Sequence, residues 1–426
     1  MISKNILKEV LLEQKQKLES LNQEDFIIRE MLIEIEKFVN IKHSIVISGI
    51  RRCGKSVLIF EIIKRFFKDN YYFINFQDER LADFTVQDFN VLYETLIELF
   101  GKQKTFFLDE IQNVEGWEKW VRRMYDDGFK FFLTGSNAKL LSKELATLLT
   151  GRHLQFSVYP FSFKEFLKFR NIKYNKEDIY ITEKKAFLIR HFNEYVDVGG
   201  FPEYLNDKKI EILQGYFNDI LYHDVAERHK IEQLKELKVL ARYIIANSGN
   251  LMSYRQLSAA SQIKSVNTVI KYFSAIENSY LIFAVPYFSY SLKKQNMNPF
   301  KVYAIDISFK DAINFKFSKD IGRKYENIVA LQLKRDDIEF YYWKNVKHEE
   351  VDFIIMDKNK IKCLIQVCYD ISFKEAKERE IKSLLNASKE LKCKNLIIIT
   401  DNYDAEETIV DEKIRYVPLW KWLLDF

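Results

Sequence analysis

Eight residues in the first part of the chain have the types and spacing needed to hold a polyphosphate. Their sequence, GIRRCGKS, fits the pattern GxxxxGK[ST], in which backbone N–H groups surround phosphate oxygens, the lysine reaches the β- and γ-phosphates and the hydroxyl ligates Mg²⁺. An apolar run at 44–48 precedes the loop and a run of helical character at 57–66 follows it, so a strand and a helix N-terminus would present it to the ligand. The chain has only 12 glycines among 426 residues, so a chance match is rare. We therefore predict that ATP and Mg²⁺ bind at Gly49, Ile50, Arg51, Arg52, Cys53, Gly54, Lys55 and Ser56.

Two adjacent carboxylates follow an apolar segment at 104–108. Asp109 would hold Mg²⁺ together with Ser56, since Mg²⁺ keeps several waters and takes few carboxylates. Glu110 could act as the general base that polarises the attacking water. Such a pair can also simply end a strand in solvent. Its position downstream of a phosphate loop favours the catalytic interpretation.

Polar residues after two further strands are candidates for sensing the γ-phosphate or completing the site. Ser136 and Asn137 follow a strand at 129–134, and Asn75 ends a strand at 70–76. The alternative for the first two is a turn and a helix N-cap, where serine and asparagine are common. Arg152 precedes a strand at 154–158. It is either an arginine finger that acts on a neighbouring subunit, which would require a homo-oligomer, or a surface cation.

The order of these motifs resembles the AAA-type ATPases of archaea and bacteria in which a P-loop domain is fused to a winged helix and a restriction-endonuclease-like domain. The resemblance covers nearly the whole chain after about residue 25. It implies that Ser136 or Asn137 is sensor 1 and that Arg152 is the finger, and it implies no biological role. The segments that carry it are the phosphate loop, DExQ (Asp109, Glu110, Gln112), TGS (134–136), GR (151–152), PFSFKEF (160–166), GGFPE (199–203) and DVAERHKI (224–231).

Composition indicates a soluble, globular protein of two or three domains: 47% of the residues are hydrophobic and 30% are charged. The four cysteines have no zinc-site spacing, and Cys53 in the loop is either a small filler or an oxidisable thiol. An apolar run of 18 residues and a signal-peptide core are both missing from the sequence. We expect a cytoplasmic protein that does not interact with membranes.

The predicted fold class is α/β. Two helices within residues 5–40 lead into a P-loop NTPase (AAA-like) core, whose strands at 44–49, 70–76, 104–109, 129–134 and 154–158 alternate with helices and form a parallel sheet covered on both faces. A winged helix and a restriction-endonuclease-like α/β domain follow. The predicted domains are 1–165 (ATPase), 166–235 (helical lid), 236–310 (winged helix-turn-helix) and 311–426 (restriction-endonuclease-like).

The winged-helix region has an excess of positive charge. Between Ser253 and Lys301 there are six cations and one anion, Glu277, a local charge of +5. We expect it to contact double-stranded DNA. The alternative is a module that packs on the ATPase core or closes over the nucleotide. The cations are Arg255, Lys264, Lys271, Lys293, Lys294 and Lys301, and the predicted contact residues are Asn267, Thr268, Lys271, Tyr272, Lys293 and Lys294.

The last domain has the element order of restriction endonucleases but a degenerate site, at Glu326, Asp352, Gln366 and Cys368. Such nucleases need carboxylates on Mg²⁺ and a lysine beside the nucleophilic water. Gln366 is a poor metal ligand, and a neutral thiol at Cys368 cannot replace the lysine. We expect the fold to be kept and the activity lost, unless Lys374 or Lys377 substitutes.

Together these features predict an ATPase that couples hydrolysis to a rearrangement on DNA or a protein partner. The alternatives are a nucleotide-gated binding switch with incidental turnover, and an ATP-dependent nuclease.

Overall fold

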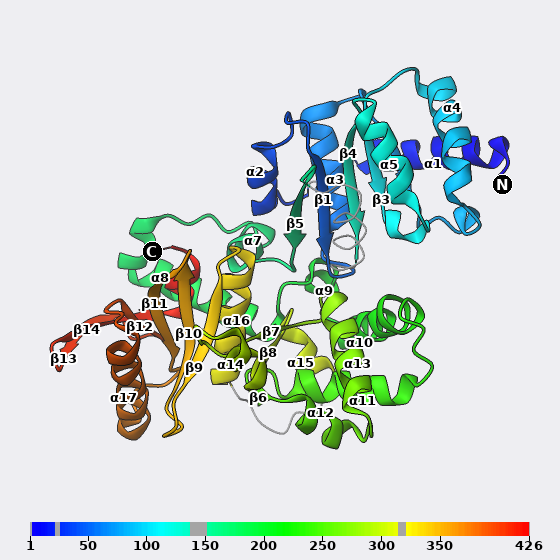
Figure 1. Ribbon diagram of the computed structural model, residues 1–426. Coiled ribbons are helices and arrows are strands. Elements are labelled where there is room, and N and C mark those ends of the chain that lie inside the picture. Colours follow the sequence, from blue (N-terminus) through cyan, green and yellow to red (C-terminus); the bar gives the residue numbers. More distant parts are fainter. Residues whose placement is uncertain (1, 22–25, 137–150, 314–320, 426) are drawn as a thin grey trace. The chain divides into compact units, whose positions relative to one another are not determined.

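The computed structural model describes residues 2–21, 26–136, 151–313 and 321–425 (Figure 1). These residues form two compact units. The first runs to Tyr159 and includes Asn278–Tyr280, and the second comprises Pro160–Glu277 and Leu281–Phe426. The predicted end of the ATPase domain at residue 165 stays a prediction.

The first unit is built on a five-stranded parallel sheet in the order β2-β3-β4-β1-β5. This confirms the predicted P-loop NTPase core. Within the described residues, helices join β1 to β2, β2 to β3 and β3 to β4, as parallel pairing requires. The strands are β1 (Ser44–Gly49), β2 (Tyr72–Asn75), β3 (Thr105–Asp109), β4 (Lys130–Gly135) and β5 (His153–Val158). The helices include α1 (Lys4–Leu21), α2 (Glu30–Glu36), α3 (Lys55–Ile62), α4 (Phe89–Phe100) and α5 (Trp117–Asp126).

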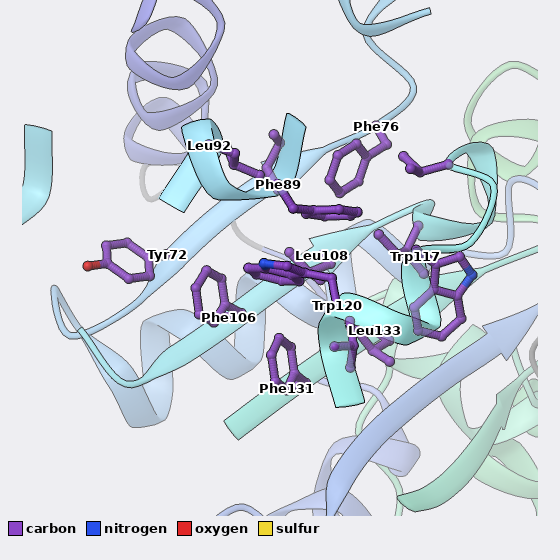
Figure 2. Close-up of a cluster of buried hydrophobic side chains, with 14 of the residues drawn as sticks. Tyr72, Phe76, Phe89, Leu92, Phe106, Leu108, Trp117, Trp120, Phe131 and Leu133 are labelled. Carbon is purple, nitrogen blue, oxygen red and sulfur yellow. The ribbon is translucent and has the colours of Figure 1, made fainter. Parts of the chain in front are cut away.

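Aromatic side chains fill the layer between this sheet and helices α4 and α5 (Figure 2). Phe89 of α4 stacks on Trp120 of α5 with ring centroids 4.5 Å apart, and Trp120 meets Phe106 of β3 edge to face. On the opposite face of the sheet, Phe107 stacks on Phe132 at 4.5 Å. Successive residues of β3 therefore pack on opposite faces. Burial on both faces explains why the strands are continuous apolar runs.

The second unit begins with helices that carry parts of three of the motif segments, PFSFKEF, GGFPE and DVAERHKI. They are α7 (Phe163–Phe169), α8 (Thr182–Val198), α9 (Pro202–Asp207), α10 (Ile210–Asp219) and η6 (Ile220–Glu227). The Gly199-Gly200 pair lies against buried backbone and a buried carboxylate. A Cβ at Gly199 would lie 2.0 Å from Oδ1 of Asp306, and one at Gly200 would lie 2.4 Å from the carbonyl oxygen of Phe161. The amide of Gly200 donates to Asp306 at 2.8 Å. Only glycine permits these approaches.

Next come three helices and a three-stranded antiparallel sheet in the order β6-β8-β7. The predicted helices and hairpin are present, and β6 and α14 are additions that the sequence did not indicate. Ser253 caps α12 in a capping box with Gln256. The elements are α11 (Leu234–Ala246), β6 (Leu251–Met252), α12 (Tyr254–Ser261), α13 (Val266–Asn278), β7 (Ile282–Val285), α14 (Leu292–Met297) and β8 (Phe300–Ala304).

The last part is a six-stranded mixed sheet in the order β13-β14-β12-β11-β10-β9. The predicted succession of helix, three strands, helix and strand is found as α16, β9, β10, β11, α17 and β12. No helix within the described residues is long and apolar enough to span a bilayer. The elements are α15 (Ser308–Ile313), α16 (Ile321–Arg335), β9 (Phe340–Lys344), β10 (Glu350–Asp357), β11 (Lys360–Val367), α17 (Lys374–Leu391), β12 (Leu396–Thr400), β13 (Ala405–Ile409), β14 (Glu412–Pro418) and α18 (Leu419–Leu423).

Candidate nucleotide-binding site and a second polar cluster

The predicted phosphate loop joins the carboxyl end of β1 to the first turn of α3. Gly49 has φ +156°, and a Cβ there would lie 2.1 Å from the carbonyl oxygen of Val158. Gly54 has φ +96° and immediately precedes Lys55, the first residue of α3. Both glycines are therefore required by backbone geometry. The loop places a helix N-terminus at the edge of the sheet where the parallel strands end, which is where this fold binds ligands.

A buried arginine that the sequence analysis did not identify supports the loop from the preceding segment. Arg29 donates from Nη1 to the carbonyl oxygen of Cys53 at 2.7 Å and from Nη2 to that of Tyr159 at 2.6 Å. Cys53 is fully buried, and burial raises the pKa of its thiol. A buried, protonated thiol favours the filler interpretation of Cys53 over a reactive one.

Lys55 lies folded over the loop. Its ammonium donates to the carbonyl oxygens of Gly49 at 3.2 Å and Ile50 at 3.3 Å, and it lies 3.5 Å from Oε1 of Glu110. Its side chain is only 5% exposed. The lysine is thus already beside the loop that would surround the phosphates. The β- and γ-phosphates are stronger acceptors than these carbonyls for a charged donor.

Asp109 is the centre of the site's hydrogen bonds. One carboxylate oxygen accepts from Ser56 at 2.9 Å and from Asn75 at 3.0 Å, and the other accepts from the Thr134 hydroxyl. Burial, and after it the Glu110 carboxylate, raises the pKa of Asp109 to about 6, although the Thr134 and Ser56 hydrogen bonds oppose this. A hydroxyl next to a buried carboxylate is a suitable oxygen pair for Mg²⁺, so the residues fit the predicted metal.

Glu110 is held in an unusual backbone conformation beside Asp109. Its φ is +53°, and its amide donates to Oγ1 of Thr134 at 2.8 Å. Its carboxylate accepts a hydrogen bond from Gln112 and lies near Lys55, as described above. Thr134 therefore positions both acidic residues, a role that the sequence did not reveal. Its place on β4, the neighbour of β3, is the signal that could have pointed to it.

The structure places the remaining predicted residues of the ATPase site in different regions. Ser136 is buried one residue beyond β4, whose Gly135 pairs with Ser48 of β1, so it lies at the phosphate-loop edge of the sheet. Asn137 lies outside the described residues. Arg152 precedes β5 at the opposite edge, where it forms an ion pair with Asp126 at 2.5 Å. Any finger role of Arg152 would thus serve another subunit's site, and it stays a prediction.

The predicted DNA-contact residues are only partly exposed. Asn267, Lys271, Lys293 and Lys294 are exposed, and Thr268 is half-buried. Tyr272 is 5% exposed, with its hydroxyl directed to Gln233, so its expected place on the open face of α13 is wrong. On the same helix Ile270 is 39% exposed.

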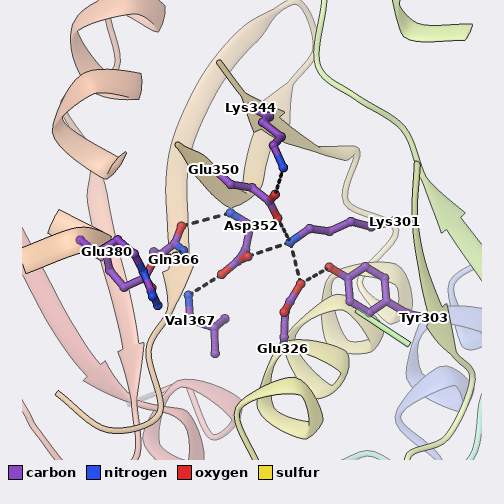
Figure 3. A network of polar contacts seen from close by, with 10 residues as sticks. Lys301, Tyr303, Glu326, Lys344, Glu350, Asp352, Gln366, Val367 and Glu380 are labelled. Carbon is purple, nitrogen blue, oxygen red and sulfur yellow. Dashed lines mark hydrogen bonds and ion pairs between the residues drawn. The ribbon is translucent and has the colours of Figure 1, made fainter. Parts of the chain in front are cut away.

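Lys301, counted above as one of the DNA-facing cations, is instead buried in a carboxylate cluster (Figure 3). Its ammonium lies 2.8 Å from each of Glu326, Glu350 and Asp352. Burial raises the pKa of Glu326 to about 7 although Lys301 opposes this. Burial alone would lower the pKa of Lys301, but the carboxylates raise it well above its usual value. Lys301 therefore does not contribute to the exposed positive charge expected between residues 253 and 301.

Two of the other degenerate-site residues lie at the same cluster or next to it. Gln366 accepts from the amide of Asp352 at 3.1 Å and donates to Glu380 at 2.6 Å. Cys368 is buried, and burial raises the pKa of its thiol to about 11, so it is neutral at physiological pH.

The two lysines considered as substitutes make their ion pairs elsewhere. Lys377 pairs with Glu407 at 2.7 Å, and the side chain of Lys374 is 88% exposed. The lysine that does reach the carboxylates is Lys301, from a different part of the chain.

The family match for residues 42–167 agrees with the P-loop fold of the first unit. Residues 42–167 match an AAA domain, residues 189–319 match a domain of unknown function (DUF8612), and residues 321–422 match another (DUF4143). The uncharacterized protein MJ1544 of Methanocaldococcus jannaschii is 42% identical over 401 residues, covering 89% of this chain and 88% of that protein. An uncharacterized protein of Haemophilus influenzae is 29% identical over 391 residues, covering 88% of this chain and 93% of that protein.

Among solved structures, the Walker-type ATPase PABY2304 of Pyrococcus abyssi is 16% identical and covers 69% of this chain and 97% of its own, with a TM-score of 0.44. At that level of similarity no functional role passes from that protein to this chain. The identity to MJ1544, by contrast, extends over most of both sequences. This protein is therefore an AAA-type P-loop protein of the family to which MJ1544 belongs.

Proposed function

We propose that this chain is a Mg²⁺-dependent ATPase whose hydrolysis cycle drives a rearrangement on double-stranded DNA or on a protein partner. The observation that carries the ATPase part is the meeting of Lys55, Ser56, Asp109 and Glu110 at one edge of the parallel sheet. The AAA match of residues 42–167 supports it.

Each side chain has a role that follows from its contacts. Lys55 would exchange the loop carbonyls for phosphate oxygens. Ser56 and Asp109 would hold Mg²⁺, which neutralises charge on the phosphates. Glu110 would orient the attacking water and accept its proton, after release from Lys55 and Gln112. Thr134 holds Asp109 and Glu110 together, and Ser136 lies at the correct edge to sense the γ-phosphate.

The DNA part of the proposal rests on an exposed basic surface of the three-helix, three-strand region, which we infer to be a winged helix. Lys271 and Asn267 are exposed on α13, and Lys293 and Lys294 are exposed on α14. Tyr290 and Leu292 beside them are 82% and 74% exposed. Lysines near an exposed aromatic ring are typical of a surface that contacts the nucleic-acid backbone. We further propose a cytoplasmic location and, through Arg152, an oligomer that forms when ATP is bound.

A nucleotide-gated switch is the second candidate, and the arrangement of Glu110 favours it. The carboxylate of this proposed base faces Lys55 and accepts from Gln112, so it needs a conformational change before it can serve water. Without a partner that triggers the change, hydrolysis would be slow and incidental to binding.

The rate of ATP hydrolysis with and without double-stranded DNA separates these candidates. For the coupled ATPase we expect turnover that rises several-fold with DNA, and loss of that stimulation in Lys271→Ala/Lys293→Ala without loss of basal turnover. Slow hydrolysis that DNA does not change would support the switch or a protein partner. Absence of hydrolysis under every condition would contradict the ATPase proposal.

A further inference from the structure

The cluster around Lys301 has the composition of a metal site but contains an ammonium at its centre. Three carboxylate oxygens, from Glu326, Glu350 and Asp352, each lie 2.8 Å from the one nitrogen (Figure 3). An ammonium has three N–H donors, so the three short contacts use all of them. No group of His, Cys, Asp and Glu side chains among the described residues is arranged to hold a metal ion.

The carboxylates are fixed by further bonds that leave them directed at Lys301. Asp352 accepts from the amide of Val367 at 2.9 Å with its other oxygen. Glu326 accepts from the Tyr303 hydroxyl at 2.7 Å, and Glu350 lies 3.3 Å from the ammonium of Lys344. The cluster is thus preorganised around a cation, as the ligands of a metal site are.

The ammonium is also unable to leave the cluster easily. Lys301 lies on β8, the central strand of its three-stranded sheet, and its side chain is 2% exposed. The same sheet is tied to the six-stranded sheet by Phe288, whose amide donates to the carbonyl oxygen of Tyr342 at 2.7 Å. Moving Lys301 out would leave the carboxylates of Glu326 and Asp352 without this counter-charge and Glu350 with only Lys344, which is unfavourable.

We propose that Lys301 is a built-in cation that occupies the place of the divalent metal in a nuclease-like carboxylate cluster. The ammonium prevents a metal ion from binding between the carboxylates. The sheet formed by β9 to β14 is therefore a metal-free structural element that packs against the β6-β8-β7 sheet. This inference is independent of the ATPase proposal. It gives the expected loss of nuclease activity a cause besides Gln366 and Cys368, namely a lysine in the position of the catalytic metal.

Mn²⁺ binding to the full chain tests the proposal, with Asp109→Asn in every protein so that the phosphate loop contributes no metal ligand. Lys301→Met keeps the length of the side chain and removes its charge. We expect Mn²⁺ at about 100 times its Kd to raise the melting temperature of this variant by a few degrees and to leave the parent's unchanged. Adding Asp352→Asn to the variant should abolish the rise. Lys293→Met, an exposed lysine, should behave as the parent does.

Three results would overturn the proposal. One is a folded Lys301→Met protein that shows no Mn²⁺-dependent shift. Another is Mn²⁺ binding, by calorimetry, to the parent that Asp352→Asn alone removes. The second measurement does not require Lys301→Met to fold: equal Mn²⁺ titrations of the parent and its Asp352→Asn variant support the proposal. Mn²⁺-dependent DNA cleavage by the wild-type chain that Asp352→Asn abolishes would also contradict it.

Discussion

Replacing Asp109 with asparagine should stabilise the nucleotide-free protein while removing its Mg²⁺ ligand. Asp109 is fully buried, and its pKa is raised from 3.8 to about 6, so its charged form is disfavoured by folding. This difference in pKa corresponds to about 3 kcal/mol in the free energy of unfolding. The protein has this stability below pH 4, where Asp109 is protonated, and loses it as the pH rises through 6. An uncharged asparagine does not incur this loss.

The hydrogen bonds around Asp109 can accept the amide. Its oxygen would face Ser56 and Asn75, and its NH₂ would donate to Thr134, whose hydroxyl oxygen has a second lone pair besides the one that accepts from Glu110. We therefore expect the advantage of Asp109→Asn to grow from about 1 kcal/mol at pH 4.5 to about 3 kcal/mol at pH 8.

Hydrogen exchange of the amides of Phe106, Phe107 and Leu108 in EDTA reports the opening free energy of the first unit. Asp88→Asn is a matched control, because Asp88 is also buried but its hydrogen bonds from Thr85 outweigh burial and lower its pKa. That variant should be destabilised by about the same amount at pH 8 and at pH 4.5, because both values lie above the ordinary pKa of an aspartate. A pH-independent effect of Asp109→Asn, or a loss of stability at pH 8, would refute the reasoning.

Three further predictions follow from the same contacts. Gly200→Ala should destabilise the second unit by several kcal/mol, measured by denaturant unfolding, because its Cβ would lie 2.4 Å from the carbonyl oxygen of Phe161; a loss below about 1 kcal/mol would contradict this. Thr134→Val should lower kcat by about tenfold or more with little change in ATP affinity, since it releases both Asp109 and Glu110; unchanged kcat would show that their positioning is not needed. If about 4 phosphates are neutralised, log Kd for DNA should change with log[salt] by about 3.6, and Lys271→Ala/Lys293→Ala should cut this slope by about 2; an unchanged slope would show that the basic surface is not the footprint.

The candidate nucleotide-binding site was predictable because the residues that define its phosphate loop are close together in the sequence. The phosphate loop is one short segment, and the spacing of its glycines, lysine and serine can be recognised without knowledge of the fold. Asp109 and Ser136 could be brought to the same place because parallel strands end at one edge of a sheet. Thr134 and Arg29 were missed, since a buried hydroxyl and a buried guanidinium have no spacing signature of their own.

The cluster around Lys301 could not be predicted from the sequence, because its residues are far apart along the chain. Lys301 precedes Glu326 by 25 positions and Asp352 by 51, and the three belong to different elements. When charges are counted along the sequence, Lys301 is simply one more cation in a basic region. The clue in the sequence is that Lys301 begins a predicted apolar strand, where a lysine is buried only when it is paired.

The most direct test of the central claim is a comparison of ATP binding and single-turnover hydrolysis in the wild type, Lys55→Ala and Glu110→Gln. We predict that the wild type binds and cleaves ATP with Mg²⁺ and stops when EDTA is added. Lys55→Ala should lose ATP binding by about 100-fold or more, and Glu110→Gln should hold ATP with near wild-type affinity while cleaving it at least about 100-fold more slowly. Wild-type rates of hydrolysis in both variants would contradict the account.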